Sequence, residues 1–271
     1  MYLKKTYKAG ITIEVHKSYS ARYGKNIPRG NRESRTSEAV KRYNEKMAWR
    51  KLTREINANF MPGDLFLTCT YQKSARPDPQ RAKKNMENFL DRLRRRFKRA
   101  GMEFKYILVN AYGKRGGIHH HLIIPAIAYP VVAACWPHGA VRFEALYPNG
   151  EYSSLAWYLI KQSHLSPSGE ESIPGNRWSG SRNLIKPVEK VEEVDAKEWR
   201  EEPKPIKGYY IDPDSVENGI SPVTGIPYQF YRMLQIQPVR EKERAKNVGI
   251  QSTKRLRTGE NCRESPCAAV K

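Results

Sequence analysis

The pattern of hydrophobic positions predicts alternating strands and helices in the middle of the chain. Residues 65–71 are rich in β-forming side chains, follow a turn at residues 62–64 and are few enough for a single strand. Further strands are predicted over residues 106–112 and 118–124. Between the first two strands a helix is predicted to end near Ala100, because apolar side chains recur at helical spacing: Met86, Phe89, Leu90, Leu93 and Phe97.

The order of these elements predicts the fold class. A strand, a helix and then two strands joined by the glycine-rich loop Gly113–Gly117 favour an antiparallel sheet with helices on one face, an α+β arrangement. Another strand is predicted around residues 141–143. A further helix is predicted to begin at residues 152–154 and to carry residues 155–161.

Extensions are expected on both sides of this core. The alternation of Ile11, Ile13 and Val15 predicts a strand, and Ser37 is a suitable N-cap for a helix to about Asn59. We interpret the acidic stretch 189–202 as a solvated helix or linker. The chain then divides into a basic strand, loop and helix (1–60), a central domain (61–190), an acidic linker with a small tyrosine-rich segment (191–237) and a basic disordered tail (238–271).

The charge of the chain points to a polyanionic partner. Its 271 residues include 49 Lys and Arg against 28 Asp and Glu, a formal net charge of +21. Nucleic acid is the leading candidate, since neutralising phosphates releases counterions. An anionic membrane is disfavoured by the lack of a long apolar run or a signal peptide. The basic, tyrosine-containing stretch 18–35 suits single-stranded nucleic acid, and a solvated loop explains it equally well.

The four cysteines do not predict a metal site. Cys69 and Cys135 have apolar or aromatic neighbours and are expected to act as small hydrophobic residues. Cys262 and Cys267 lie in a polar tail without the partner pair that a zinc knuckle needs. This usage indicates a reducing, cytoplasmic location.

Three consecutive histidines in a predicted strand are the main candidate for chemistry. Side chains alternate faces along a strand, so His119 and His121 share one face while His120 points to the other. Two imidazoles on one rigid face are half of a metal site. A hydrogen-bonded histidine cluster without metal is the alternative, and the apolar residues on both sides favour the metal site.

A second candidate lies on the predicted helix after residue 154. Tyr158 and Lys161 are spaced i and i+3, so they share a helix face. A nearby ammonium would favour the phenolate, or stabilise the phosphate that the phenolate attacks. With a histidine pair in the same domain, this spacing is typical of phosphoryl transfer to a tyrosine.

With these motifs the chain resembles the HUH endonucleases, and within them the bacterial and phage rolling-circle replication initiators. The resemblance extends over most of the chain. It is carried, in order, by residues 59–71, the histidines at 119–121, Tyr158 with Lys161, residues 181–184 with Pro187, and residues 208–210 followed by Thr224 and Gly225.

The resemblance implies a fold and a reaction. The fold is a ferredoxin-like or RRM-like antiparallel palm, with the histidine strand central and the tyrosine helix facing it. Tyr158 would attack a phosphodiester in single-stranded origin DNA, leaving a 5′-phosphotyrosine and a free 3′-hydroxyl that primes synthesis. A later 3′-hydroxyl would rejoin the strand. Such an enzyme is a metal-dependent endonuclease and strand transferase of a plasmid, phage or integrated element.

The cofactor and the remaining site residues follow from the same resemblance. Mn²⁺ or Mg²⁺ is expected, held by His119, His121 and Asn110, the last standing where related chains carry an acidic residue. The expected partners are single-stranded origin DNA and a host helicase or polymerase, with no membrane partner. The residues expected to contact DNA are Thr68, Thr70, Arg92, Arg95, Arg99, Lys114, Arg115 and Arg182.

Other functions remain open at this stage. A transposase or a conjugative relaxase would use the same chemistry. A non-catalytic origin-binding regulator would keep the fold without cleaving DNA, and Asn110 in place of an acid favours it. An RNA-binding structural protein would explain the charge and the aromatic residues, and it would give the histidine pair no role.

Overall fold

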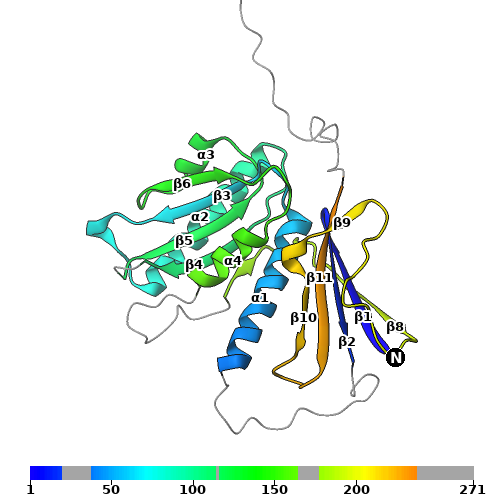
Figure 1. Cartoon of the computed structure of the whole chain (residues 1–271). Helices are drawn as coiled ribbons and strands as arrows, with labels where there is room; N and C mark the ends of the chain where they lie inside the picture. The colour runs from blue at the N-terminus through cyan, green and yellow to red at the C-terminus, as the bar shows by residue number, and fades with distance from the viewer. Residues whose placement is uncertain (20–37, 114–115, 164–176, 237–271) are drawn as a thin grey trace, which may run out of the picture. The chain divides into compact units, whose positions relative to one another are not determined.

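Two antiparallel sheets organise the part of the chain that the structure, a computed structural model, describes: residues 1–19, 38–113, 116–163 and 177–236 (Figure 1). The helices in these ranges are α1 (Glu38–Asn59), α2 (Pro79–Arg99), α3 (Tyr129–Ala133) and α4 (Ser153–Gln162), with 3₁₀ turns at Lys73–Ala75 and Pro213–Ser215. All of these residues belong to one compact unit, Met1–Pro238.

The first sheet contains the predicted histidine strand at its centre. Its strands, in spatial order, are β6 (Val141–Ala145), β3 (Leu65–Thr70), β5 (Ile118–Ile124), β4 (Ile107–Tyr112) and β7 (Ser179–Gly180). Every pairing is antiparallel. The predicted α+β class and antiparallel sheet are therefore confirmed.

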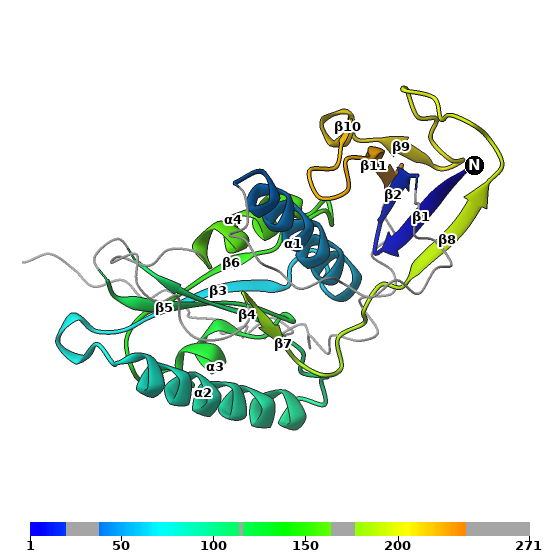
Figure 2. The ribbon, with the colours of Figure 1, turned by 90° about the horizontal axis from the view of Figure 1, so that it is seen from below.

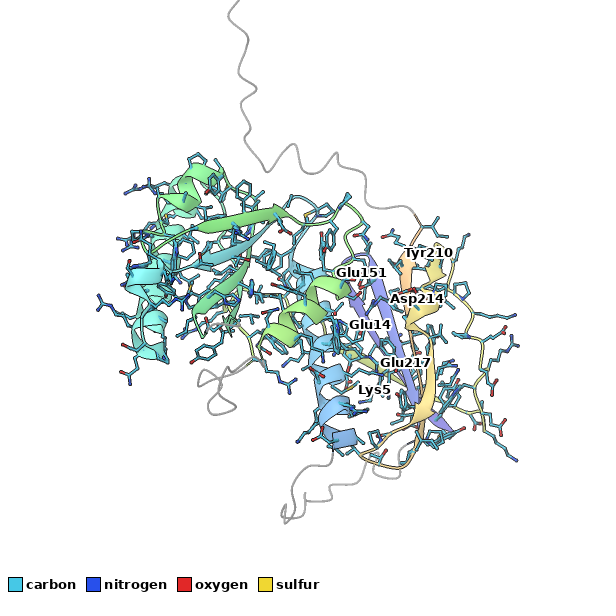
Figure 3. All side chains as sticks on the ribbon, turned by 60° about the vertical axis from the view of Figure 1, so that its left-hand side comes forward. Lys5, Glu14, Glu151, Tyr210, Asp214 and Glu217 are labelled. Carbon is cyan, nitrogen blue, oxygen red and sulfur yellow. The ribbon has the colours of Figure 1, made fainter. Side chains whose placement is uncertain are left out.

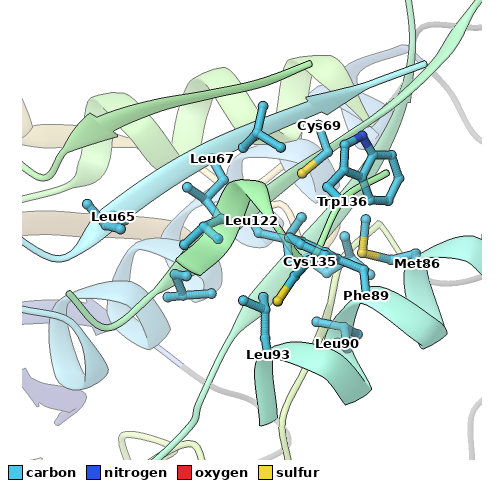
Figure 4. Packing of buried hydrophobic residues seen from close by; sticks show 14 of the residues in the cluster. Leu65, Leu67, Cys69, Met86, Phe89, Leu90, Leu93, Leu122, Cys135 and Trp136 are labelled. Carbon is cyan, nitrogen blue, oxygen red and sulfur yellow. The ribbon is translucent and has the colours of Figure 1, made fainter. Parts of the chain in front are cut away.

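One face of this sheet is covered by α2 and α3. Asp78 caps α2 by accepting from the backbone N–H of Arg81, and Pro79 starts the helix in its first turn. The predicted apolar face of α2 packs on Leu67, Leu122 and their neighbours (Figure 4). Cys69 and Cys135 are buried free thiols in this core, as expected from the sequence.

The opposite face of the sheet is covered in part by α1 and α4. Leu52 and Ile56 of α1 and Leu159 of α4 pack with Ile107 and Ile123 of the sheet. Figure 2 shows α2 and α3 on one side of the sheet and α1 and α4 on the other. Helices thus lie on both faces and not on one as predicted, because strands β4 and β5 carry apolar side chains on both faces.

A second sheet joins the two ends of the described chain. It contains β10 (Glu217–Ile220), β11 (Pro227–Gln235), β2 (Thr12–Ser18), β1 (Tyr2–Ala9) and β8 (Glu189–Val194), with β9 (Tyr209–Ile211) paired to β11. The start of the stretch interpreted as a solvated helix or linker is in fact strand β8. Its acidic side chains pair with lysines of β1: Lys4 Nζ lies 3.1 Å from Glu192 Oε2. The expected tail, 238–271, lies outside the described residues.

Helix α1 and a buried arginine connect the second sheet to the first. Arg232 of β11 is 3% exposed, and its guanidinium lies 3.1 Å from Glu151 Oε1, just before α4, and 3.5 Å from Glu14 Oε1 of β2. Figure 3 shows Glu14 and Glu151 at this end of the second sheet. On α1, Arg54 also pairs with Glu14, at 2.9 Å. Within the described ranges, no helix is long and apolar enough to cross a membrane.

Candidate active site

Strand β5 presents His119 and His121 on the face of the sheet that carries α4. Their ring centroids are 4.8 Å apart. The neighbouring strand β3 places Thr70 opposite His119 and Thr68 opposite His121. The paired imidazoles that the sequence predicted are therefore held side by side by strand register alone.

His121 has one ring nitrogen bonded and one without a partner. Its Nδ1 lies 3.1 Å from Thr68 Oγ1, while its buried Nε2 has no hydrogen-bond partner among the described residues. The ring also stacks on Phe66, with centroids 5.5 Å apart. Burial, and then the neighbouring His119, lower the pKa of His121 to about 3, so the ring is neutral at physiological pH. A neutral imidazole with one fixed nitrogen and one open nitrogen is what a metal ligand requires.

His119 lies at the hairpin end of the strand, in a more open position. Burial lowers its pKa, and a hydrogen bond with the backbone of Gly117 partly offsets this effect. The hairpin itself closes through the backbone N–H of Gly113, which donates to Gly117 over 2.8 Å. His119 lines a cavity of about 340 Å³ together with Thr70 and Arg76. A ligand in this cavity would reach the histidine pair from the hairpin side.

His120 faces the opposite side and belongs to the core. Its Nε2 lies 2.9 Å from the Tyr71 hydroxyl, and its Nδ1 lies 2.7 Å from Asn110 Oδ1. Burial and the neighbouring histidines hold the pKa of His120 at about 3. The prediction that Asn110 is a metal ligand is therefore wrong in this structure, because β4 pairs Asn110 with His120 and turns its amide away from the other two histidines.

Tyr158 lies against His121. The centroids of their rings are 5.4 Å apart, and the Tyr158 ring also meets Phe66 edge-on at 6.2 Å. The side chain is 42% exposed, so the phenol remains accessible. Helix α4 is held from α1, where Asn57 accepts from the backbone N–H of Tyr152 and Trp49 donates to the Ser153 carbonyl.

Lys161 pairs with helix α1 in this structure and not with the phenol of Tyr158. Its ammonium lies 3.0 Å from Glu45 of α1 and 4.3 Å from the centre of the Trp157 ring. The pKa of Tyr158 is raised, first by burial and then by the Glu144 carboxylate, which disfavours the phenolate. The ammonium-assisted phenolate expected from the i, i+3 spacing is thus not formed before DNA binds.

Strand β6 adds two charged residues that the sequence did not single out. Arg142 pairs with Thr68 and Glu144 with Phe66 across the sheet. Both line a cavity of about 460 Å³ that also contains Tyr158. A cation of this kind beside a candidate nucleophile suits a phosphate group. Alternation along the predicted strand 141–143 could have placed Arg142 on one of the two faces, although only the pairing of β6 with β3 identifies which.

The other expected DNA contacts are dispersed over the molecule. Thr68 and Thr70 lie on the site face. Arg92, Arg95 and Arg99 belong to α2 and so lie on the far side of the sheet (Figure 2). Arg182 follows Ser181, which bonds to Tyr106 at the end of β4 away from the histidine pair. Lys114 and Arg115 lie outside the described residues.

Comparison with known families places a replication module on this site. Residues 64–163 match the model of the replication-associated protein ORF2 family. The matched stretch runs from the residue before β3 to the end of α4, so it contains both histidines and Tyr158 and leaves out the second sheet. It covers less than half of the chain, and it supports a role in replication and contact with DNA. Neither the curated proteins nor the solved structures gave a match.

The histidine pair fits a divalent metal in part. The unpartnered Nε2 of His121 and the adjacent His119 provide two ligands on one face. In the described ranges, no third His, Cys, Asp or Glu completes a three-ligand group. Divalent metals in phosphoryl-transfer sites commonly take water and substrate phosphate as the remaining ligands.

Proposed function

We propose that the first sheet and α4 form a tyrosine-dependent enzyme that nicks and rejoins single-stranded DNA and so starts rolling-circle replication. The observation that carries this proposal is the contact of an accessible tyrosine, Tyr158, with His121 of a neutral histidine pair. The match of this same stretch to a replication-associated family supports the biological role.

His119 and His121 would hold Mn²⁺ or Mg²⁺. When bound, that ion would polarise the scissile phosphate and neutralise charge on it. Thr68 keeps Nδ1 of His121 occupied, so that Nε2 faces the ligand. Arg142, from the neighbouring strand, supplies a positive charge on the wall of the cavity that contains Tyr158.

The reaction exchanges one phosphate ester for another. The Tyr158 oxygen forms a bond to phosphorus as the bond from phosphorus to the 3′-oxygen breaks. The phenol loses its proton and the departing oxygen gains one. The product is a 5′-phosphotyrosine and a free 3′-hydroxyl, and because the ester is retained, the reverse attack rejoins a strand without ATP.

A labelled single-stranded origin oligonucleotide tests this proposal. With Mn²⁺ present, the protein should form a covalent adduct that survives denaturation. Tyr158→Phe should abolish the adduct. Tyr147→Phe is the matched control, since Tyr147 is exposed and lines the same cavity. An adduct that persists in Tyr158→Phe would refute the assignment of the nucleophile.

A non-catalytic origin-binding regulator is the second candidate. The position of Lys161 against Glu45 and the raised pKa of Tyr158 favour it. Tight binding of the oligonucleotide with no adduct, under every divalent metal tried, would support this candidate. The family match favours replication over transposition or conjugation, and the buried free thiols agree with action in the cytoplasm.

A further inference from the structure

A cavity of about 820 Å³ lies between α1 and the second sheet, outside the stretch that matches the replication-associated family. Its floor is one face of the sheet, because alternate residues of β1, β2 and β11 line it. Its roof is the face of α1 that carries Tyr43, Met47 and Arg50. Lys5, Glu14 and Glu217 lie along this side of the sheet (Figure 3). None of these residues contributes to the proposed reaction.

Flat aromatic and guanidinium groups line the cavity. His16 and Tyr228 are stacked, with centroids 5.6 Å apart and planes 17° from parallel. The Arg50 guanidinium lies 3.3 Å from the centre of the Phe230 ring, and Arg54 lies 4.0 Å from the centre of the Tyr7 ring. Exposed π surfaces beside guanidinium groups are typical of sites where nucleobases stack.

The charges around the cavity compensate one another. Lys5 pairs with Glu189, Arg54 with Glu14, and both Arg50 and Lys46 with Glu217. Burial, and then the cations Arg50, Lys5 and Arg54, lower the pKa of His16 to about 4, so this ring is neutral. Paired cations are less available to a phosphate, whereas a neutral stacked wall with polar edges suits a base.

One polar atom in the wall lacks a partner. Arg50 is 2% exposed, and its Nε has no hydrogen-bond partner among the described residues. Leaving a buried donor unsatisfied is unfavourable. A carbonyl or ring nitrogen on the edge of a nucleobase would satisfy it.

From these observations we propose that the cavity binds a nucleobase of the single-stranded DNA whose scissile phosphate lies at Tyr158. This inference rests on the proposed function. Helix α1 connects the two places, since it contacts Trp157 and Lys161 of α4 through Trp49 and Glu45 and lines the cavity through Arg50. A helix is about 10–12 Å across with its side chains, so a strand could pass over it within a few nucleotides.

The test measures equilibrium binding in the Tyr158→Phe background, so that no adduct can form. Fluorescence anisotropy with a labelled single-stranded oligonucleotide compares Tyr228→Ala, Tyr228→Phe and Tyr210→Ala. Loss of one stacked base should weaken binding roughly tenfold in Tyr228→Ala. Tyr228→Phe keeps the ring and should restore affinity. Tyr210 is an exposed tyrosine of the same sheet that does not line the cavity, so Tyr210→Ala should leave affinity unchanged.

Two results would overturn the proposal. Unchanged affinity in a folded Tyr228→Ala protein would show that the cavity is not part of the DNA path. Tighter binding of a matched RNA oligonucleotide, with the same dependence on Tyr228, would assign the cavity to RNA. Failure of the proposed function is a separate result, since it appears as a missing adduct in the protein with Tyr158 intact.

Discussion

Strand alternation assigns different roles to three neighbouring histidines. His119 and His121 share the face that Tyr158 occupies, and His120 is fixed in the core by Tyr71 and Asn110. The sequence predicted this division, since it requires only the period of a strand. The error at Asn110 was avoidable. A five-residue hairpin loop pairs Tyr112 with Ile118 and therefore Asn110 with His120.

Replacing His121 with Ala should reduce adduct formation by at least about a hundredfold, because a metal ligand supports several kcal/mol of transition-state stabilisation. Binding of single-stranded DNA should change little. A quenched time course measures the rate, and anisotropy measures the affinity. Equal losses in both measurements would indicate that His121 serves DNA binding or folding instead of chemistry.

His120→Ala should act on stability. The substitution leaves the buried Tyr71 hydroxyl and the Asn110 amide without their partner, and each such group costs about 1–3 kcal/mol. We expect the free energy of unfolding in urea to fall by roughly 2–4 kcal/mol, with adduct formation retained where the variant is folded. A stable variant that fails to form the adduct would mean that the strand faces are wrongly assigned.

Lys161→Met tests a residue that the sequence placed in catalysis and the structure places elsewhere. Its ammonium pairs with Glu45 at a half-exposed position, and such pairs contribute about 0–1 kcal/mol. We expect the rate of adduct formation to stay within about fivefold of the unmodified protein, which corresponds to that energy. A hundredfold loss would show that Lys161 leaves Glu45 and reaches the phosphate when DNA binds.

At the scale of elements, the buried Arg232 joins the second sheet to the start of α4. Glu151 accepts from Arg232 and also from the backbone N–H and hydroxyl of Ser153, so it both pairs with β11 and holds the first turn of the tyrosine helix. Glu14, which is 2% exposed, depends on the same guanidinium. The position of Tyr158 thus depends in part on strand β11, more than seventy residues further along the chain.

Arg232→Met should destabilise the protein by about 3–5 kcal/mol, because it leaves buried carboxylates without their cation. Lys190→Met is the matched control, since Lys190 also pairs with a glutamate but is largely exposed, and it should change stability by about 0–1 kcal/mol. Chemical unfolding measures both. A similar small effect in the two variants would mean that the Arg232 network does not hold the sheet to α4.

The same scale shows where sequence reasoning stops. Local periodicity was enough for β3, β5, α1 and α2, whose apolar faces repeat at the period of a strand or helix. Strand β8 has no such face. Its residues alternate acidic and apolar side chains only weakly, and it becomes a strand because Lys4 and Lys5, almost two hundred residues away, pair with its glutamates. Pairing between distant charges cannot be read from a local pattern.

At the scale of the whole molecule, the basic face of α2 and the proposed active site lie on opposite sides of the first sheet. Arginines of α2 therefore cannot contact the scissile phosphate at Tyr158. They can bind only a part of the DNA that wraps to the other side of the domain.

Replacing Arg95 and Arg99 with Gln should weaken DNA binding and flatten its salt dependence, by up to about 0.7 per lost phosphate contact in a plot of log affinity against log salt for single strands. The rate of adduct formation at saturating DNA should not change, because neither side chain faces the reacting groups. Titrations at several salt concentrations measure the slope. An unchanged slope would remove α2 from the DNA path.

The position of the covalent phosphate tests the central claim most directly. After reaction with single-stranded DNA and nuclease digestion, trypsin should release the peptide Phe143–Lys161, which contains Tyr147, Tyr152 and Tyr158. Fragmentation by mass spectrometry distinguishes the three tyrosines. The account predicts a nucleotide on Tyr158 alone. A nucleotide on another residue, or a nicked strand with no nucleotide attached to the protein, would contradict it.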